Sequence, residues 1–329
     1  MKYLIVDTAN TFFRARHAAF RAADTWTKLG FAIHVTLGGI NKAWREHKAD
    51  HVVFCLEGRS WRKDYYEPYK KNRAVARAAL SEKELEEDKL FWETFDEFKS
   101  FVIDKSNCTV LQHPNLEADD LIAGWIQSHP DDEHIIISTD SDFHQLLSAN
   151  VSQYNGVNDE FHTINGIFDK KGKPVIDKKT KEAKTIPDPE WILFEKCMRG
   201  DVSDNIFSAY PGVRTKGTKN KIGLQEAFAD RKNKGFNWNN LMLQRWVDHN
   251  DVEHRVLDDY ERNRVLVDLT AQPDHIKELI AQTIAENSVT KQVPQIGSKF
   301  LKFCGKYELN RISEQAQQYA EMLSSEYKV

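Results

Sequence analysis

Apolar runs of four to six residues alternate with longer amphipathic stretches over the first half of the chain. Such runs are typical of buried parallel strands, and they occur at residues 3–6, 51–56, 108–112, 134–138 and 151–154. Helical spacing fills the intervals, at residues 10 to about 23, 31–47, about 81–102 and 118–127. This βαβ order predicts an α/β fold with a central, mostly parallel, doubly wound sheet.

The pattern changes in the second half. Glycines at 156, 166 and 172 and Pro174 punctuate the segment around residues 158–187, and seven lysines lie between 170 and 184, which predicts a hairpin or an irregular, mobile insertion. Asp188 and Pro189 have the pattern of an N-cap followed by a first-turn proline, so a helix should run to about Arg199. The remainder looks mostly helical. We therefore expect one region over 1–187 and a second, mainly helical region over 188–329.

Composition sets further bounds. The chain has 329 residues, of which 40% are hydrophobic, enough for a substantial core. No apolar run approaches the roughly 18 residues that a membrane span requires, and the N-terminus reads as a strand rather than a signal peptide. The four cysteines lack the spacing of a metal site, so free thiols in a reducing cytosol are expected.

Carboxylates gather where the predicted strands end. Nine such acids stand out: Asp7, Glu57, Glu117, Asp119, Asp120, Asp140, Asp142, Asp201 and Asp204. Most follow a strand on its carboxyl side, the edge at which open parallel sheets build their sites. If these acids converge, their repulsion requires cations, and oxygen ligands favour Mg²⁺, Mn²⁺ or Ca²⁺ over zinc. The pattern therefore favours metal-assisted phosphate chemistry.

Each acidic motif has a simpler structural interpretation. The acids from Glu117 to Asp120 could compensate a helix dipole, and Asp140 and Asp142 could form an Asx turn. Asp201 and Asp204 could belong to an ordinary connection between helices. A phosphoaspartyl mechanism, by contrast, needs a second aspartate two residues after Asp7, where this chain has Ala9.

The charge distribution suits a polyanionic substrate better than the net charge of −4 suggests. Residues 59–77 hold seven Lys or Arg against two acids, a local charge of +5. Residues 214–234 have the same balance. Such runs are also typical of solvated faces, so they support nucleic-acid binding only together with the acids.

Three motifs in order carry a family resemblance: Glu117-Ala-Asp-Asp120, Ser138-Thr-Asp-Ser-Asp-Phe143 and Gly200-Asp-Val-Ser-Asp-Asn205. Their order and spacing resemble the flap endonuclease and 5′-3′ exonuclease superfamily. The segment from Trp61 to Arg73 is closest to the T-even-phage ribonuclease H type of that superfamily. The resemblance covers roughly residues 1–230, and little is recognised beyond about 235.

The resemblance implies a PIN-like nuclease core with a helical arch at about 58–100, and a helix-hairpin-helix-type DNA-binding motif in the C-terminal region. It implies two Mg²⁺ ions, for which Mn²⁺ should substitute. Asp7, Asp120 and Asp140 would hold the tighter ion. The second would be held directly or through water by Glu117, Asp119, Asp142, Asp201 and Asp204.

The basic residues gain roles from the same resemblance. Lys70 and Arg73 would act as catalytic residues that neutralise charge on the scissile phosphate. Further contacts to nucleic acid are implied for Arg14, Arg62, Tyr66, Tyr69, Arg214, Lys216, Lys219 and Lys221. For Arg14 and the basic and aromatic residues of the arch, the alternative is a solvated basic helix.

Two features depart from the family pattern. Glu57 stands where the family usually has aspartate, and its extra methylene moves the carboxylate by about 1.5 Å, so it could ligate in a shifted geometry or through water. The hairpin after Pro211 is longer than the family's, which puts the family's monovalent-cation site there in doubt.

The predicted function is that of a structure-specific 5′ nuclease in DNA replication, of the kind that removes RNA primers. Substrates would be DNA with a 5′ flap, fork or nick and RNA–DNA hybrid, with a sliding clamp or single-strand-binding protein as further partners. We expect a monomer that avoids membranes and works in the cytoplasm, or in the host cytosol if a phage encodes it. The competing interpretations are a PIN-type single-strand ribonuclease and a non-catalytic DNA-binding relative with a degenerate site.

Overall fold

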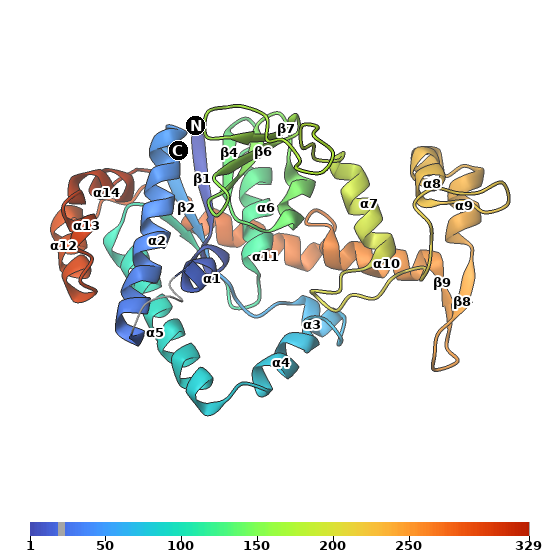
Figure 1. Cartoon of the computed structure of the whole chain (residues 1–329), viewed down its shortest axis with the longest axis horizontal. Helices are drawn as coiled ribbons and strands as arrows, with labels where there is room; N and C mark the ends of the chain where they lie inside the picture. Colours follow the sequence, from blue (N-terminus) through green and yellow to red (C-terminus); the bar gives the residue numbers. More distant parts are fainter. Residues whose placement is uncertain (19–23, 329) are drawn as a thin grey trace. The chain divides into compact units, whose positions relative to one another are not determined.

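The computed structural model describes residues 1–18 and 24–328 (Figure 1). Residues 19–23, the end of the helix predicted over 10–23, lie outside the described residues. Chain contacts define two compact units. Unit 1 comprises Met1–Ser60, Leu80–Ile186 and His275–Val329, and unit 2 comprises Trp61–Ala79 and Pro187–Asp274. Each unit is described by itself below.

Unit 1 contains a seven-stranded sheet in the order β3-β2-β1-β4-β5-β6-β7. The strands are β1 (Lys2–Asp7), β2 (His51–Cys55), β3 (Thr109–Leu111), β4 (Glu133–Ile137), β5 (Val151–Asn155), β6 (Glu160–Thr163) and β7 (Gly166–Asp169). The first five are parallel, whereas β6 is antiparallel to both of its neighbours. The predicted doubly wound, mostly parallel sheet is confirmed, and the first part of the lysine-rich insertion forms the β6–β7 hairpin.

Helices connect the parallel strands, and local sequence signals set where they begin. They are α1 (Thr8–Ala18), α2 (Thr25–Glu46), α5 (Glu82–Lys105) and α6 (Ala118–Ser128), with a short 3₁₀ helix, η2 (Ser141–Leu146), after β4. The helix predicted to start at Phe31 begins at Thr25 instead, because the Asp24 side chain caps it by accepting the Thr27 N–H. Ser81 and Glu84 form a capping box at the start of α5.

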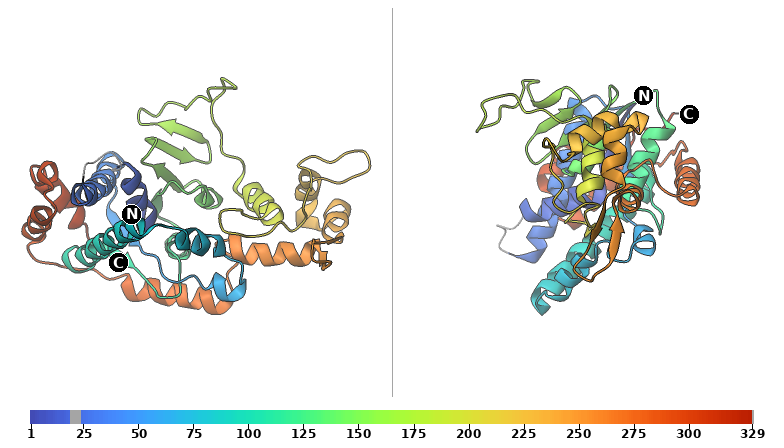
Figure 2. Two further views of the ribbon diagram at one scale, coloured as in Figure 1. Left: turned by 60° about the horizontal axis from the view of Figure 1, so that its bottom comes forward. Right: turned by 90° about the vertical axis from the view of Figure 1, so that its right-hand side faces the viewer.

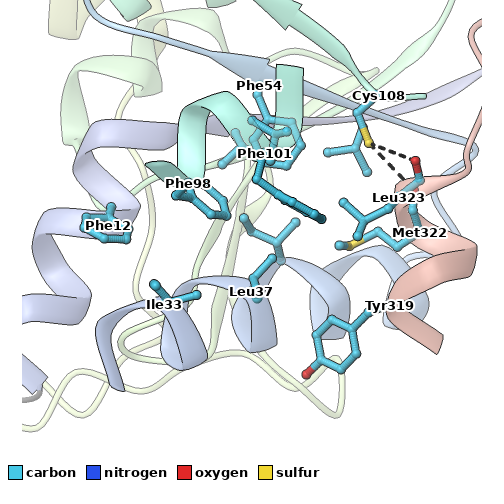
Figure 3. Packing of buried hydrophobic residues seen from close by; sticks show 14 of the residues in the cluster. Phe12, Ile33, Leu37, Phe54, Phe98, Phe101, Cys108, Tyr319, Met322 and Leu323 are labelled. Atoms are coloured by element: carbon cyan, nitrogen blue, oxygen red, sulfur yellow. Dashed lines mark hydrogen bonds between the residues drawn. The ribbon is translucent and has the colours of Figure 1, made fainter. Parts of the chain in front are cut away.

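The core of unit 1 draws on the two ends of the sequence (Figure 3). Phe12, Phe98 and Phe101 pack in it together with Met322 and Leu323 near the C-terminus. The C-terminal helices that reach this core are α12 (Ile296–Lys306), α13 (Asn310–Ser313) and α14 (Ala316–Leu323). Helix α11 (Asp274–Asn287) lies elsewhere in the fold, where its Ile280 and Ile284 approach Gly124 of α6. The linear division at residue 187 thus differs from the division by contacts, since residues 275–328 pack with the α/β unit.

Unit 2 is mainly helical. Its helices are α3 (Arg62–Tyr65), α4 (Lys71–Ala78), α7 (Pro189–Arg199), α8 (Leu224–Asp230), η3 (Arg231–Asn233), α9 (Phe236–Met242) and α10 (Val256–Val267), joined by a small hairpin of β8 (Arg245–Val247) and β9 (Glu253–Arg255). As predicted, Asp188 caps α7, accepting the N–H groups of Glu190 and Trp191. One apolar cluster of unit 2 contains Tyr69, Cys197 and Ile206 together with residues at the end of α10.

The cysteines agree with the expectation of free thiols, since all four are buried and none is disulfide-bonded. Among residues 1–18 and 24–328, no helix combines the length and apolar character needed to cross a bilayer.

Candidate metal centre

Two of the predicted ligands meet at the carboxyl edge of the unit 1 sheet. Asp7 is the last residue of β1, and Asp140 follows the neighbouring strand β4. The buried Ser138 hydroxyl donates to Asp7 Oδ2 at 2.7 Å, and its Oγ accepts the Asp140 N–H at 3.0 Å. One serine hydroxyl therefore joins the two carboxylate-bearing loops, a role that the sequence interpretation did not assign to Ser138.

The turn that carries Asp140 and Asp142 is internally braced. Asp140 Oδ1 accepts the Asp142 N–H at 2.9 Å, the Asx-turn arrangement, and caps η2. The side-chain amide of the buried Gln153 donates to the carbonyl oxygens of Ser138 and Asp140 at 2.9 and 2.8 Å. The turn is thus fixed from β5, and Asp140 Oδ2 makes none of these bonds.

A third group of acids opens α6. Glu117 and Asp120 are 3% and 0% exposed, which is rare for carboxylates in a folded protein. Asp120 Oδ2 accepts the Glu117 N–H at 3.2 Å, and Glu117 Oε2 accepts the Ser60 hydroxyl at 2.8 Å. Asp119 is half-buried. Capping explains part of this arrangement, and carboxylate oxygens such as these are also suitable ligands for a divalent cation.

Glu57, the departure from the family pattern, lies at the same helix start. It is exposed, and its Oε2 accepts the Ala118 N–H at 3.3 Å. An anion at this position is favoured by the helix dipole. Its longer side chain therefore has an anchor on α6.

Carboxylates from three segments of the chain influence the pKa of one buried thiol, that of Cys55. Burial raises the pKa of the Cys55 thiol well above its usual value. The neighbouring carboxylates of Asp7, Asp119 and Glu57 raise the pKa further. These charges come from β1, α6 and the loop after β2, which the sheet brings to one edge.

The donor set fits a hydrated divalent cation. Within residues 1–18 and 24–328, no three His, Cys, Asp or Glu side chains are grouped closely enough to enclose an ion by themselves. Mg²⁺ keeps several waters and is usually bound through one or two carboxylates, so an open, all-oxygen edge suits it.

In unit 2, the predicted ligand Asp201 is held by a lysine. Asp201 Oδ2 lies 2.7 Å from Lys196 Nζ, and Oδ1 accepts the Ser203 N–H at 2.8 Å. Burial would raise the pKa of Asp201, but the bonds from Lys196 and Ser203 outweigh burial and lower it to about 2. The carboxylate is therefore charged at neutral pH, with the Lys196 ammonium as its partner in the structure.

Asp204 gathers the basic residues predicted to be catalytic. Its Oδ1 lies 2.6 Å from Arg73 Nη2, and its Oδ2 lies 3.7 Å from Lys70 Nζ and 3.1 Å from the Tyr69 hydroxyl. The Lys70 N–H also donates to the Asp204 carbonyl at 2.8 Å, and Lys70 has a left-handed φ of 54°. Unit 2 thus holds this loop and the basic segment together as one assembly.

Two predicted nucleic-acid contacts are corrected by this packing. Tyr69 is 4% exposed and belongs to an apolar cluster of unit 2, so it is not placed to stack on a base. Arg62 is 2% exposed because its Nε donates to the Leu266 carbonyl at 2.8 Å. Tyr66 is half-buried, with the Arg262 guanidinium 5.0 Å from its ring centroid.

The remaining predicted contacts are exposed. They are Arg14 on α1 and, between α7 and α8, Arg214, Lys216, Lys219 and Lys221. Within that loop the N–H groups of Gly217 and Gly223 each donate to Glu226 Oε2 at 2.9 Å. A carboxylate of the protein therefore occupies these two amides, whereas the basic side chains of the loop are exposed to solvent.

Comparison with known proteins gives the same class. Residues 2–179 match the family described as 5′-3′ exonuclease, N-terminal resolvase-like domain. The flap endonuclease Xni of Shewanella piezotolerans is 30% identical over 236 residues, covering 70% of this chain and 79% of that protein. Ribonuclease H of Enterobacteria phage T4 is 28% identical over 245 residues, covering 68% and 66%. DNA polymerase I of Rhizobium leguminosarum is also 28% identical, but the chain matches only 20% of its length.

Solved structures show the same fold. The T5 5′-exonuclease with bound zinc superposes with a TM-score of 0.59 at 19% identity, covering 87% of this chain and 99% of that one. The T5 D15 flap endonuclease in a pseudo-enzyme-product complex with DNA and metal ions gives 0.56 at 18% identity, covering 87% and 98%. Fold and acidic edge together define a metal-dependent phosphodiester hydrolase. More particularly, the chain belongs to the 5′-3′ exonuclease and flap endonuclease family, and its activity is that of a structure-specific 5′ nuclease.

Proposed function

We propose that the protein removes RNA primers and 5′ flaps during DNA replication, with two Mg²⁺ ions as cofactors. The observation that best supports this function is the Ser138 bridge between Asp7 and Asp140, at an edge where Asp119 and Glu57 also concentrate negative charge. The expected substrates are DNA with a 5′ flap, fork or nick and RNA–DNA hybrid. Because the family reads nucleic-acid shape through phosphates, cleavage should depend on structure and not on sequence.

Each group of residues has a proposed role. Asp7, Asp120 and Asp140 hold the tighter ion, and the second ion is held directly or through water by Glu117, Asp119, Asp142, Asp201 and Asp204. Glu57 ligates metal in a shifted geometry or through water. When bound, such ions make a coordinated water more acidic and neutralise charge on the scissile phosphate. Lys70 and Arg73 leave the Asp204 carboxylate to contact that phosphate, so their charge supports the developing oxyanion.

The C-terminal helices are the proposed docking region for protein partners. Helices α11–α14 pack into unit 1, so a sliding clamp or single-strand-binding protein would dock on their exposed faces. We propose a monomer that works in the cytosol, of the host if the chain is phage-encoded.

The test is Mg²⁺-dependent release of product from a 5′-labelled forked duplex, compared with single-stranded RNA of the same sequence. The fork should be cut much faster, and Asp140→Asn should reduce the rate by at least about 100-fold by weakening metal binding and charge neutralisation. Faster cutting of plain RNA would favour a single-strand ribonuclease. Full activity in Asp140→Asn would refute the assignment of this carboxylate, and no cleavage of any substrate would indicate a non-catalytic relative.

A further inference from the structure

The lysine-rich insertion has no role in the function proposed so far, although it continues the sheet that carries the acids (Figure 2). One row of paired residues crosses five strands: Val6, Ile137, Tyr154, Phe161 and Phe168. Because β6 reverses direction and β7 reverses it again, β7 runs parallel to β1. Its carboxyl end therefore lies at the same edge of the sheet as Asp7.

The residue after Phe168 is Asp169, and it opens a tight turn with three lysines. We call residues 169–173 the lysine turn. Asp169 stands one row beyond Phe168, as Asp7 stands one row beyond Val6. Neighbouring strands lie about 4.8 Å apart, so four spacings place the lysine turn roughly 19 Å from β1 along this edge.

The lysine turn is stabilised by internal hydrogen bonds, in which the Asp169 carboxylate accepts backbone N–H groups of the same turn. Asp169 Oδ1 accepts the N–H groups of Lys171 and Lys173 at 2.8 and 2.9 Å. The Asp169 N–H donates to the Lys173 carbonyl at 2.8 Å, and Gly172 supplies the positive φ of 70° that the turn requires. Lys170, Lys171 and Lys173 are exposed, so three positive charges against one leave the turn with a net charge of +2.

Nearby acids are matched by cations of their own. Asp159 pairs with Lys42 at 2.7 Å, and Glu160 lies 3.6 Å from Lys184. The field beyond this part of the edge is consequently set by the lysine turn. Exposed lysines grouped in one turn suit a polyanion, and the acidic edge lies roughly 19 Å away along the same side of the sheet.

We propose that the lysine turn binds backbone phosphates of the nucleic-acid substrate some distance from the scissile bond. One strand advances about 3.4 Å per nucleotide, so a separation of roughly 19 Å corresponds to about five or six nucleotides. This inference rests on the proposed function, since it assumes that the scissile phosphate lies at the acidic edge. It adds a contact surface on unit 1 to the exposed basic loop of unit 2.

The insertion also supplies a matched control. Residues 177–182 form a second Asx turn, in which Asp177 Oδ1 accepts the N–H groups of Lys179 and Thr180. Its lysines, Lys178, Lys179 and Lys181, are likewise exposed. Because the intervening segment pairs antiparallel to β7, through Phe168 and Pro174, this second turn lies towards the opposite edge of the sheet.

The experiment measures binding to a fluorescent forked duplex in EDTA, across a range of salt, for two triple variants. Lys170→Ala, Lys171→Ala and Lys173→Ala together should lower the slope of log K against log salt by about 2 to 3, at 0.7–0.9 per contact. Each lost contact should weaken binding by up to about eight-fold at 0.1 M salt. Lys178→Ala, Lys179→Ala and Lys181→Ala together should leave the slope and affinity close to wild type.

Substrate length provides a second readout. When the arm that crosses the lysine turn is shortened below about five nucleotides, the wild type should bind no better than the first variant. Lys170→Arg, Lys171→Arg and Lys173→Arg together should keep wild-type binding, because arginine preserves the charge.

Equal losses in both triple variants would show a general charge effect and overturn the proposal, as would unchanged binding in the first. In either case, wild-type cleavage of the same fork would leave the proposed function standing. A wild type that neither bound nor cleaved the fork would refute the function itself.

Discussion

The Ser138 hydroxyl offers the sharpest test of how the metal centre is built. Ser138 is 2% exposed and Asp7 is 5% exposed, so the 2.7 Å bond between them is shielded from water. Ser138→Ala removes this bond and also the acceptor of the Asp140 N–H. A buried hydrogen bond to a charged group contributes about 1.5–3 kcal/mol, so we expect the free energy of unfolding to fall by about 2 kcal/mol.

The effect on metal affinity should be larger than a general loss of stability explains. Groups that orient metal ligands typically change affinity by about 10–100-fold when they are lost. We therefore expect the Mg²⁺ concentration for half-maximal cleavage to rise by about that factor in Ser138→Ala. Calorimetric titration with Mn²⁺, without substrate, gives the same quantity independently of activity.

The matched control is Ser152→Ala, in the neighbouring strand β5. Ser152 donates to a neutral backbone carbonyl, that of His134, at 3.3 Å. Its loss should cost no more than about 1 kcal/mol and leave the metal dependence unchanged. If Ser138→Ala were destabilised but kept the wild-type Mg²⁺ and Mn²⁺ titrations, Ser138 would only stabilise the fold, and the bridge would have no part in metal binding.

Two further predictions concern unit 2. Asp201 has a pKa of about 2 in the folded protein against an ordinary 3.8. Its bonds therefore raise the free energy of unfolding above pH 4, and this contribution is lost as the pH falls towards 2. In Lys196→Met, the free energy of unfolding measured in urea should fall less steeply between pH 4 and 2. Lys70→Ala should lower the turnover of a forked duplex by about 100-fold or more while weakening duplex binding only slightly, because its charge is needed most in the transition state.

Each of these predictions has a contrary outcome. If the free energy of unfolding of Lys196→Met fell as steeply as that of the wild type between pH 4 and 2, other groups would set the pKa of Asp201. The control is Lys232→Met, because the Lys232 side chain is exposed. Equal losses of turnover and duplex affinity in Lys70→Ala would make that lysine a binding residue. Lys71→Ala, next to it and paired with the exposed Glu67, should change neither quantity.

Sequence pattern predicted the parallel strands and most helices because burial imposes period and length on those segments. It could not predict the β8–β9 hairpin, whose strands have three residues each and contain no buried residue. Arg62 was misjudged for a similar reason, since the carbonyl that buries it belongs to Leu266, 204 positions away. Long-range partners of that kind leave no local signal.

In the candidate site, too, local patterns were predictable and long-range contacts were not. Acids at strand ends were predictable because the carboxyl ends of parallel strands lie at one edge of the sheet. Ser138 was not, because a serine after a strand is common and its two bonds depend on the register of β1 with β4. Glu226 was also unpredictable as the partner of two loop amides, since only the folded loop brings Gly217 and Gly223 to its carboxylate.

Each compact unit is built from segments that are far apart in the sequence, which affects how the protein can be divided into fragments. A cut near residue 187 would look natural from the sequence, yet neither product would carry a complete core. The N-terminal fragment would lose Phe300, Met322 and the other C-terminal side chains of its apolar interior. The C-terminal fragment would lose Tyr69, which lies in the cluster with Cys197 and Ile206. The two halves of this sequence are therefore not separable folding modules, and limited proteolysis in the 170–187 segment should yield fragments that stay associated.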